Sequence, residues 1–171
     1  MNGEEAKARV IGEFERVYDE TLGRLLGLGP ADLDRPAWQG EGPGWRVRDL
    51  VPHLARWNRI GAEAARLIAA GKEPAPEPDM RLRPFIGIAE DVDTVNDATF
   101  RAWRERSDAD RFAELRSAHA AFMDALRALP AARVVKDDGT AFRYFWTPGA
   151  GHLQLHWEHI QAARATEGAI G

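Results

Sequence analysis

Cysteine is absent from the 171 residues of the chain. This absence excludes a disulfide, a thiolate metal ligand and a cysteine nucleophile, so any bound metal must rest on His, Asp or Glu side chains. The sequence also lacks a Ser-His-Asp order, a glycine-rich phosphate loop and a nucleophile elbow. The usual sequence signatures of covalent hydrolysis and phosphate binding are therefore missing.

An excess of positive charge is missing as well. The chain has 23 Lys and Arg residues against 27 Asp and Glu residues, which gives a formal net charge of -4. Nucleic-acid-binding domains usually carry a basic patch or stripe. We therefore expect no nucleic-acid partner.

Long apolar runs do not occur, and the first five residues are polar and acidic rather than typical of a signal peptide. We therefore expect a cytoplasmic protein that does not associate with membranes. Apolar residues make up 44% and charged residues 29% of the chain, and this length suits one globular domain over residues 1–171. Arginine supplies most of the basic residues and alanine is abundant, which suggests a GC-rich bacterial genome.

Apolar residues recur at steps of three and four in several segments, which is typical of amphipathic helices. The first helix is expected over residues 4–28 and the second from residue 45 to about residue 70. The third is expected in two pieces, from a cap at Asp93 or Thr94 to residue 106 and from a capping box at 107–110 to residue 129. The fourth should begin at Thr147 and Pro148 and end near residue 167. Without a convincing sheet, this pattern predicts an all-α four-helix bundle.

The connections between these helices differ in length. Residues 30–44 predict a loop with one short turn at 31–34 and Trp38 as its apolar anchor. A long proline-rich connection over residues 72–91 should join the second and third helices, with Phe85, Ile86 and Ile88 packed inward. Residues 133–146, with Asp138 and Gly139 in the middle, predict either a small hairpin or a plain loop.

Three of the five histidines fall within eight residues near the C-terminal end. On a helix, His152 and His156 lie about 40° and one turn apart, so both rings can reach one point. His53 lies on the apolar face of the second helix, and sites in such bundles form between facing helices. Three imidazoles leave coordination positions open on zinc, nickel or iron. We therefore consider His53, His152 and His156 as metal ligands.

Other assignments stay open at this stage. In one alternative, each of the three histidines is a core or rim residue with its own hydrogen bonds, without a metal. His159 lies roughly 10 Å along the helix from His152 and either replaces it as a ligand, lines a pocket or faces solvent. His119 is expected at a core position, with a role behind the ligands as the alternative. Trp57, one turn after His53, is either core or a pocket wall.

Several short motifs resemble the DinB-like superfamily. Residues 45–57 (WRVRDLVPHLARW) are similar to the opening of its second helix, and GHLQLH at 151–156 followed by Ile160 is similar to its fourth helix. DTVNDATF at 93–100 resembles its ClbS/DfsB-like branch. The resemblance implies a four-helix bundle, often dimeric, with a divalent metal on His53, His152 and His156. Two departures are Arg46, where the family has a capping Ser, and Pro52, which should loosen the helix ahead of His53.

Together these observations favour a metal-dependent enzyme that acts on a small electrophilic molecule, either as a hydrolase or as a thiol-dependent transferase or isomerase. The resemblance implies a low-molecular-weight thiol such as mycothiol or bacillithiol as co-substrate, and a homodimer. The sequence assigns no catalytic acid or base. The alternative is a non-catalytic small-molecule or toxin-binding self-resistance protein of ClbS/DfsB type. A third option is a structural metal closed by His119 or His159.

Overall fold

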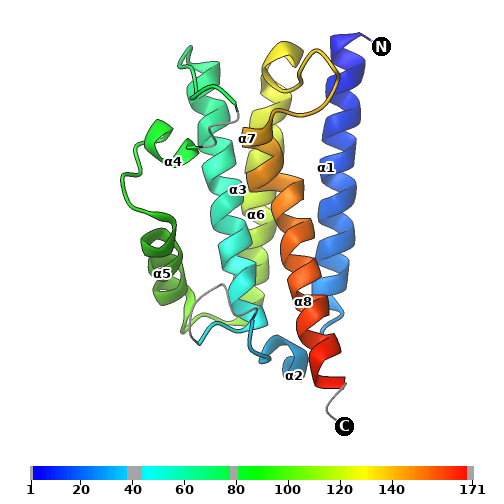
Figure 1. The fold of residues 1–171 in the computed structure, drawn as a ribbon, viewed down its shortest axis with the longest axis vertical. Helices are drawn as coiled ribbons and strands as arrows, with labels where there is room; N and C mark the ends of the chain where they lie inside the picture. Colours follow the sequence, from blue (N-terminus) through cyan, green and yellow to red (C-terminus); the bar gives the residue numbers. More distant parts are fainter. Residues whose placement is uncertain (1, 38–43, 78–80, 169–171) are drawn as a thin grey trace.

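The fold was analysed in a computed structural model, which describes residues 2–37, 44–77 and 81–168. Four long helices run side by side as a bundle, and the C-terminal helix α8 lies between α1 and α3 (Figure 1). These helices are α1 (Gly3–Leu26), α3 (Val47–Ala69), α6 (Asp108–Ala128) and α8 (His152–Gly168). The described residues form no β-strand and contain only two isolated bridges, Pro36 with Arg46 and Val135 with Ala141. The predicted all-α four-helix bundle is confirmed.

Shorter helical elements connect the bundle helices. They are α2 (Pro30–Leu33), α4 (Leu82–Phe85), α5 (Val92–Trp103), the 3-10 turn η1 (Ala131–Arg133), α7 (Arg143–Trp146) and the π turn η2 (Thr147–Gly151). Both α4 and α5 lie outside the bundle, on the side of α3 that faces away from α1 (Figure 1). The third bundle helix is therefore α6 alone, and α5 is an additional helix that packs on α3.

The core forms where the bundle helices approach closely. Leu54, Leu115 and Phe122 are completely or almost completely buried, and the Phe14 ring stacks on Phe122 at 6.2 Å. Gly61 allows α3 to approach α6, since a Cβ atom there would lie 2.6 Å from the Phe122 ring. A side chain at position 61 would therefore separate the two helices.

Side-chain carboxylate and hydroxyl groups cap the first turns of α5 and α6. Ser107 caps α6 and accepts a hydrogen bond from the Asp110 amide, as the predicted capping box requires. The predicted cap of the preceding helix, α5, was wrong. This helix begins at Val92, and Asp91 caps it instead of Asp93 or Thr94. The Asp91 carboxylate accepts a hydrogen bond from the Thr94 amide at 2.8 Å. An aspartate one residue before the first helical turn reaches this amide most directly.

Arg46 and Pro52, the two residues that depart from the family's motif, do not interrupt α3. Asp49 accepts a hydrogen bond from the Arg46 amide at 2.8 Å, so the carboxylate supports the helix start while the Arg46 guanidinium binds Asp34. The helix continues without a break through Pro52, so the expected loosening is not observed. Pro52 lies near the N-terminal end, where few intrahelical bonds are lost.

The segment before α8 differs from the prediction. The hairpin expected over residues 133–146 is reduced to one bridge around Gly139, whose φ of 79° suits a tight turn, and residues 143–146 are helical. Thr147 and Pro148 do not start the last helix. They lie in η2, which joins α7 to α8. Pro148 has no amide hydrogen, and Gly149 departs from helical backbone angles (φ -103°, ψ -118°), so the chain kinks here between two helical segments.

The long connection between α3 and α5 packs against the core through its described residues 82–88. Leu82 is buried, and Phe85, Ile86 and Ile88 pack against the core as predicted. Trp38, the expected loop anchor, lies outside the described residues. No helix in the described part of the chain has the length and apolar character needed to cross a bilayer.

Candidate metal centre

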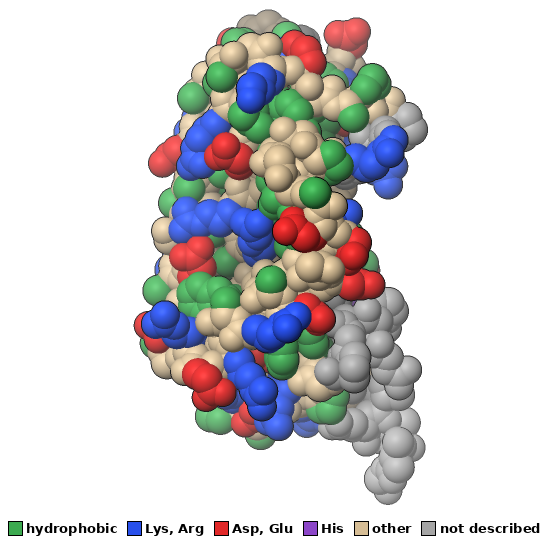
Figure 2. All heavy atoms as spheres, turned by 90° about the vertical axis from the view of Figure 1, so that its left-hand side faces the viewer, with side chains coloured by type: hydrophobic (Ala, Val, Ile, Leu, Met, Phe, Trp, Pro, Cys, Tyr) green, Lys and Arg blue, Asp and Glu red, His purple; other side chains and the backbone are tan. Residues whose placement is uncertain are grey.

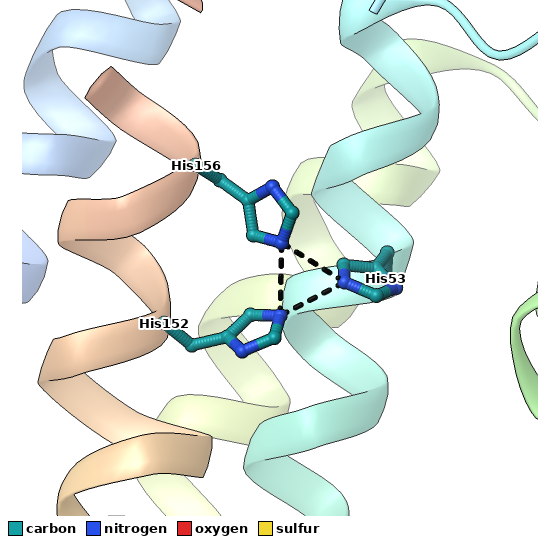
Figure 3. Close-up of side chains that lie close together, drawn as sticks. All are labelled: His53, His152 and His156. Atoms are coloured by element: carbon teal, nitrogen blue, oxygen red, sulfur yellow. Dashed lines mark hydrogen bonds between the residues drawn. The ribbon is translucent and has the colours of Figure 1, made fainter. Parts of the chain in front are cut away.

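Three histidine side chains meet between α3 and α8. Figure 3 shows His152 and His156 pointing from α8 towards His53 on α3. The Nε2 atom of His53 lies 2.8 Å from that of His152 and 3.1 Å from that of His156, and the last two are 3.0 Å apart. His53 and His156 are buried and His152 is half-buried. Within the described residues, these three form a group that can hold a metal ion.

The donor atoms fit a cation better than they fit one another. A neutral Nε2 atom carries either a hydrogen or a lone pair in the ring plane. Among three mutually adjacent Nε2 atoms, at least one pair must therefore present like groups to each other, which is unfavourable. A cation removes this conflict because all three lone pairs can face it. A tetrahedral zinc ion separates its nitrogen ligands by about 3.3 Å, so a small outward movement of the rings would seat it.

Burial keeps these imidazoles neutral. Loss of contact with water lowers the pKa of His53 to about 4, although the neighbouring Asn96 side chain acts in the opposite direction. Burial, followed by the neighbouring imidazoles, lowers the pKa of His152 and of His156 well below the usual value. Neutral imidazole is the form that binds a metal. The site is therefore prepared for a cation near neutral pH.

Aromatic side chains surround the group. The Trp45 ring meets the His53 ring edge-on at 5.4 Å, and Phe100 of α5 stacks on Trp45 at 5.7 Å. Trp57 stacks on His152 at 5.0 Å. Trp57 therefore lies beside the histidines, which is compatible with its predicted role as a pocket wall. These rings limit the access of water to the side of His53.

The segment η2 leads directly into the helix that carries His152 and His156. Gly149 within η2 has non-helical backbone angles, so the chain changes direction there before it continues as α8. His152 is the first residue of α8, directly after this turn. The carbonyl of Pro148 within the turn accepts a hydrogen bond at 3.3 Å from Asn58, a completely buried residue of α3. This bond connects the turn to the helix that carries His53.

The remaining histidines lie outside the group. The His159 ring contacts His156 edge-on at 5.4 Å, but its nitrogens do not join the converging atoms. His119 occupies the predicted core position, where it stacks on Tyr18 at 3.6 Å and lies 3.2 Å from the Asn58 side-chain oxygen. Neither closes the three-histidine group as a fourth ligand, which was the geometry expected of a structural metal.

Sequence reasoning gave no role to Asn58 or Asn96. Asn58 follows Leu54 by one turn on the apolar face of α3, and a polar amide on such a face is a recognisable signal of a buried hydrogen-bond network. Asn96 lies within the segment 93–100 that resembles the ClbS/DfsB-like branch, but only its contact with His53 shows what it does. Trp45 is the first residue of the motif at residues 45–57, and sequence reasoning assigned it no role beyond that motif.

The fold and this site together define a DinB-like helical bundle with a candidate three-histidine metal centre. The chain belongs to the family described as "Mycothiol maleylpyruvate isomerase N-terminal domain", which matches residues 14–143 and is part of the DinB/YfiT-like superfamily. The matched residues include His53 and end before His152 and His156. Membership in the ClbS/DfsB-like branch remains a prediction.

A solved structure supports the fold. The chain is similar to an uncharacterised protein from Escherichia coli UTI89, with a TM-score of 0.68 and 14% sequence identity, over 95% of this chain and 94% of the other. At this identity the similarity concerns the fold alone. No curated protein matches the chain.

Proposed function

We propose that the protein is a metal-dependent enzyme that joins a low-molecular-weight thiol to a small electrophilic molecule, or isomerises that molecule with the thiol as co-substrate. The observation that carries this proposal is the convergence of three Nε2 atoms within 3.1 Å of one another. The name of the matched family, which refers to mycothiol, supports the thiol. Hydrolysis is the corresponding reaction with water as the nucleophile.

His53, His152 and His156 would hold the ion. A divalent ion such as zinc, nickel or iron supplies Lewis acidity there and lowers the pKa of a bound thiol or water towards neutral. Three protein ligands leave room for one or two small molecules, which distinguishes a reactive centre from a closed structural site.

The chain's own side chains would prepare this centre. Asn96 of α5 would accept a hydrogen bond from the Nδ1 atom of His53 and so fix the direction of the Nε2 lone pair. Trp57 and Trp45 cover the rings of His152 and His53. By excluding water from these faces, they would favour the thiol over water as the nucleophile.

Metal analysis of protein purified without a histidine tag tests the proposal. We expect about one divalent ion per chain in the wild type and almost none after His53→Ala or His156→Ala. The metal-loaded wild type should consume an electrophile such as 1-chloro-2,4-dinitrobenzene faster when mycothiol or bacillithiol is added, and both variants should lose this rate. Metal content that neither substitution changes would overturn the proposal.

A second experiment on the wild type distinguishes the metal-dependent enzyme from a metal-independent binding protein. A thermal-shift series with apolar compounds, with and without chelator, would show stabilisation that ignores the chelator if the protein is a binding or self-resistance protein. A metal-dependent enzyme should instead lose thermal stability when the chelator is added, because an ion bound only to the folded state stabilises that state.

A further inference from the structure

A second candidate site lies on the face of α3 that carries Pro52, Arg56 and Arg59. A cavity of about 600 Å³ opens between α3, α5, α6 and residues 87–90. Figure 2 shows this face of the molecule, where basic side chains lie in a hollow at mid-height. Arg56 and Arg59 of α3 line the cavity together with Val95 and Trp103 of α5. Its volume is in the range of small-molecule sites.

One wall of the cavity is apolar. Val95 is only 7% exposed, and Ile88 and Trp103 are half-buried at the cavity surface. Ala98 and Ala102 leave space between these larger side chains. A flat apolar group would bury its surface against this wall.

Arg56 supplies an uncompensated positive charge at the same cavity. It is half-buried and forms no hydrogen bond or ion pair with any described residue. Arg59 provides the contrast: its guanidinium binds both Glu114 carboxylate oxygens at 3.0 and 3.2 Å and the Ser117 hydroxyl at 2.9 Å. Glu114, which also lines the cavity, is therefore already neutralised. Glu90 is exposed to solvent at the cavity rim.

We propose that this cavity is a binding site for a small organic carboxylate, with its apolar body on the α5 wall and its carboxylate paired with Arg56. A carboxylate matches the planar guanidinium and forms two parallel hydrogen bonds with it. The pairing removes the cost of a half-buried charge without a partner. The site is separate from the histidine group, although Pro52 lines the cavity and His53 follows it in the chain.

Calorimetric titration with 2-naphthoate, and with the uncharged 2-naphthamide of the same shape, tests this site. We expect naphthoate to bind the wild type at one site and at least about tenfold more tightly than naphthamide. Arg56→Gln should weaken naphthoate binding by about tenfold or more and leave naphthamide binding unchanged. Arg101→Gln is the matched control, because Arg101 lies on the exposed side of α5 and binds Asp97; it should bind naphthoate like the wild type.

Two further measurements separate this site from its alternatives. Ala98→Trp, at an exposed position that lines the cavity, should block naphthoate while the thermal melt stays like that of the wild type. Titration after chelator treatment should give the same affinity, because a carboxylate bound to a metal at the histidines would be lost with the metal. The proposal is overturned by equal affinity for the acid and the amide, by full affinity in Arg56→Gln or Ala98→Trp, by loss of binding with chelator, or by no binding of naphthoate.

Discussion

Asn58 and Pro148 lie 90 positions apart in the chain and are joined by a hydrogen bond from the Asn58 side-chain amide to the Pro148 carbonyl. The same amide donates to the Leu54 carbonyl at 3.0 Å, so the Asn58 oxygen is the acceptor for His119. One buried side chain thus connects α3, α6 and the π turn that precedes His152. We therefore expect the position of the histidine group to depend on this connection.

Asn58→Ala should destabilise the fold by about 2–4 kcal/mol, since it leaves the Pro148 carbonyl and a His119 nitrogen without partners in the core. Urea unfolding measures this change. Metal affinity should fall as well, because the π turn is no longer held against α3. Gln161→Ala, which removes an exposed side-chain amide of α8, is the control and should change stability by less than about 0.5 kcal/mol. An Asn58→Ala protein as stable as this control would contradict the connection.

Asn96→Ala should separate metal affinity from stability. Asn96 is half-buried on α5 and contacts His53, so its removal costs little packing but frees the ring. We expect metal affinity to fall by about 10–100-fold, the usual effect of losing the group that orients a histidine ligand. Competition with a chromogenic chelator measures the affinity. If the affinity matches that of the exposed-site variant Asp97→Ala, Asn96 does not orient His53.

The choice between His152 and His159 as the third ligand can be tested directly. His152→Ala should abolish stoichiometric metal binding, because its Nε2 atom lies 2.8 Å from that of His53. His159→Ala should retain about one ion per chain, because its ring contacts the side of His156 and its nitrogens lie outside the converging group. Elemental analysis of the two proteins gives the answer. The reverse result would assign the site to His159.

His119 should make the fold sensitive to acid. Burial, and to a smaller extent Arg127, lowers its pKa to about 4 in the folded state, against 6.5 for an unperturbed histidine. Between these values the unfolded chain binds more protons, so stability is complete above pH 6.5 and is lost as the pH falls towards 4. The contribution is at most about 3 kcal/mol. His119→Gln should lose less stability than the wild type between pH 7 and 4 in urea unfolding; parallel curves would contradict this assignment.

Gly61 and Gly12 form a matched pair for helix packing. A Cβ atom at Gly61 would lie 2.6 Å from the Phe122 ring, whereas one at Gly12 has no neighbour within 4 Å. Gly61→Ala should therefore destabilise the fold by about 1–3 kcal/mol. Gly12→Ala, in the exposed part of α1, should stabilise it by about 0.5–1 kcal/mol, because alanine favours the helix. Thermal unfolding of both variants measures the difference, and equal effects would contradict the close α3–α6 contact.

Local patterns were sufficient for most of the helices. Apolar spacing located α1, α3 and α6 to within about three residues, and the Ser107 capping box located the start of α6 because a cap acts over only three residues. The i, i+4 spacing of His152 and His156 is equally local. Sequence reasoning failed at Thr147 and Pro148, which resemble a helix start but lie within a helical path that begins at Arg143.

The sequence by itself determined the class of fold and the pair of histidines on one helix face, since both follow from the fixed period of the α-helix. Only the tertiary structure brought His53 to this pair, left His159 beside it and used Asn58 to hold the π turn. It also placed α5 outside the bundle, so that a cavity lined by Arg56 of α3 opens between α3 and α5. These features depend on distances between segments remote in the chain, and such distances are set by the packing of α3 against α6 and α8, not by the local sequence.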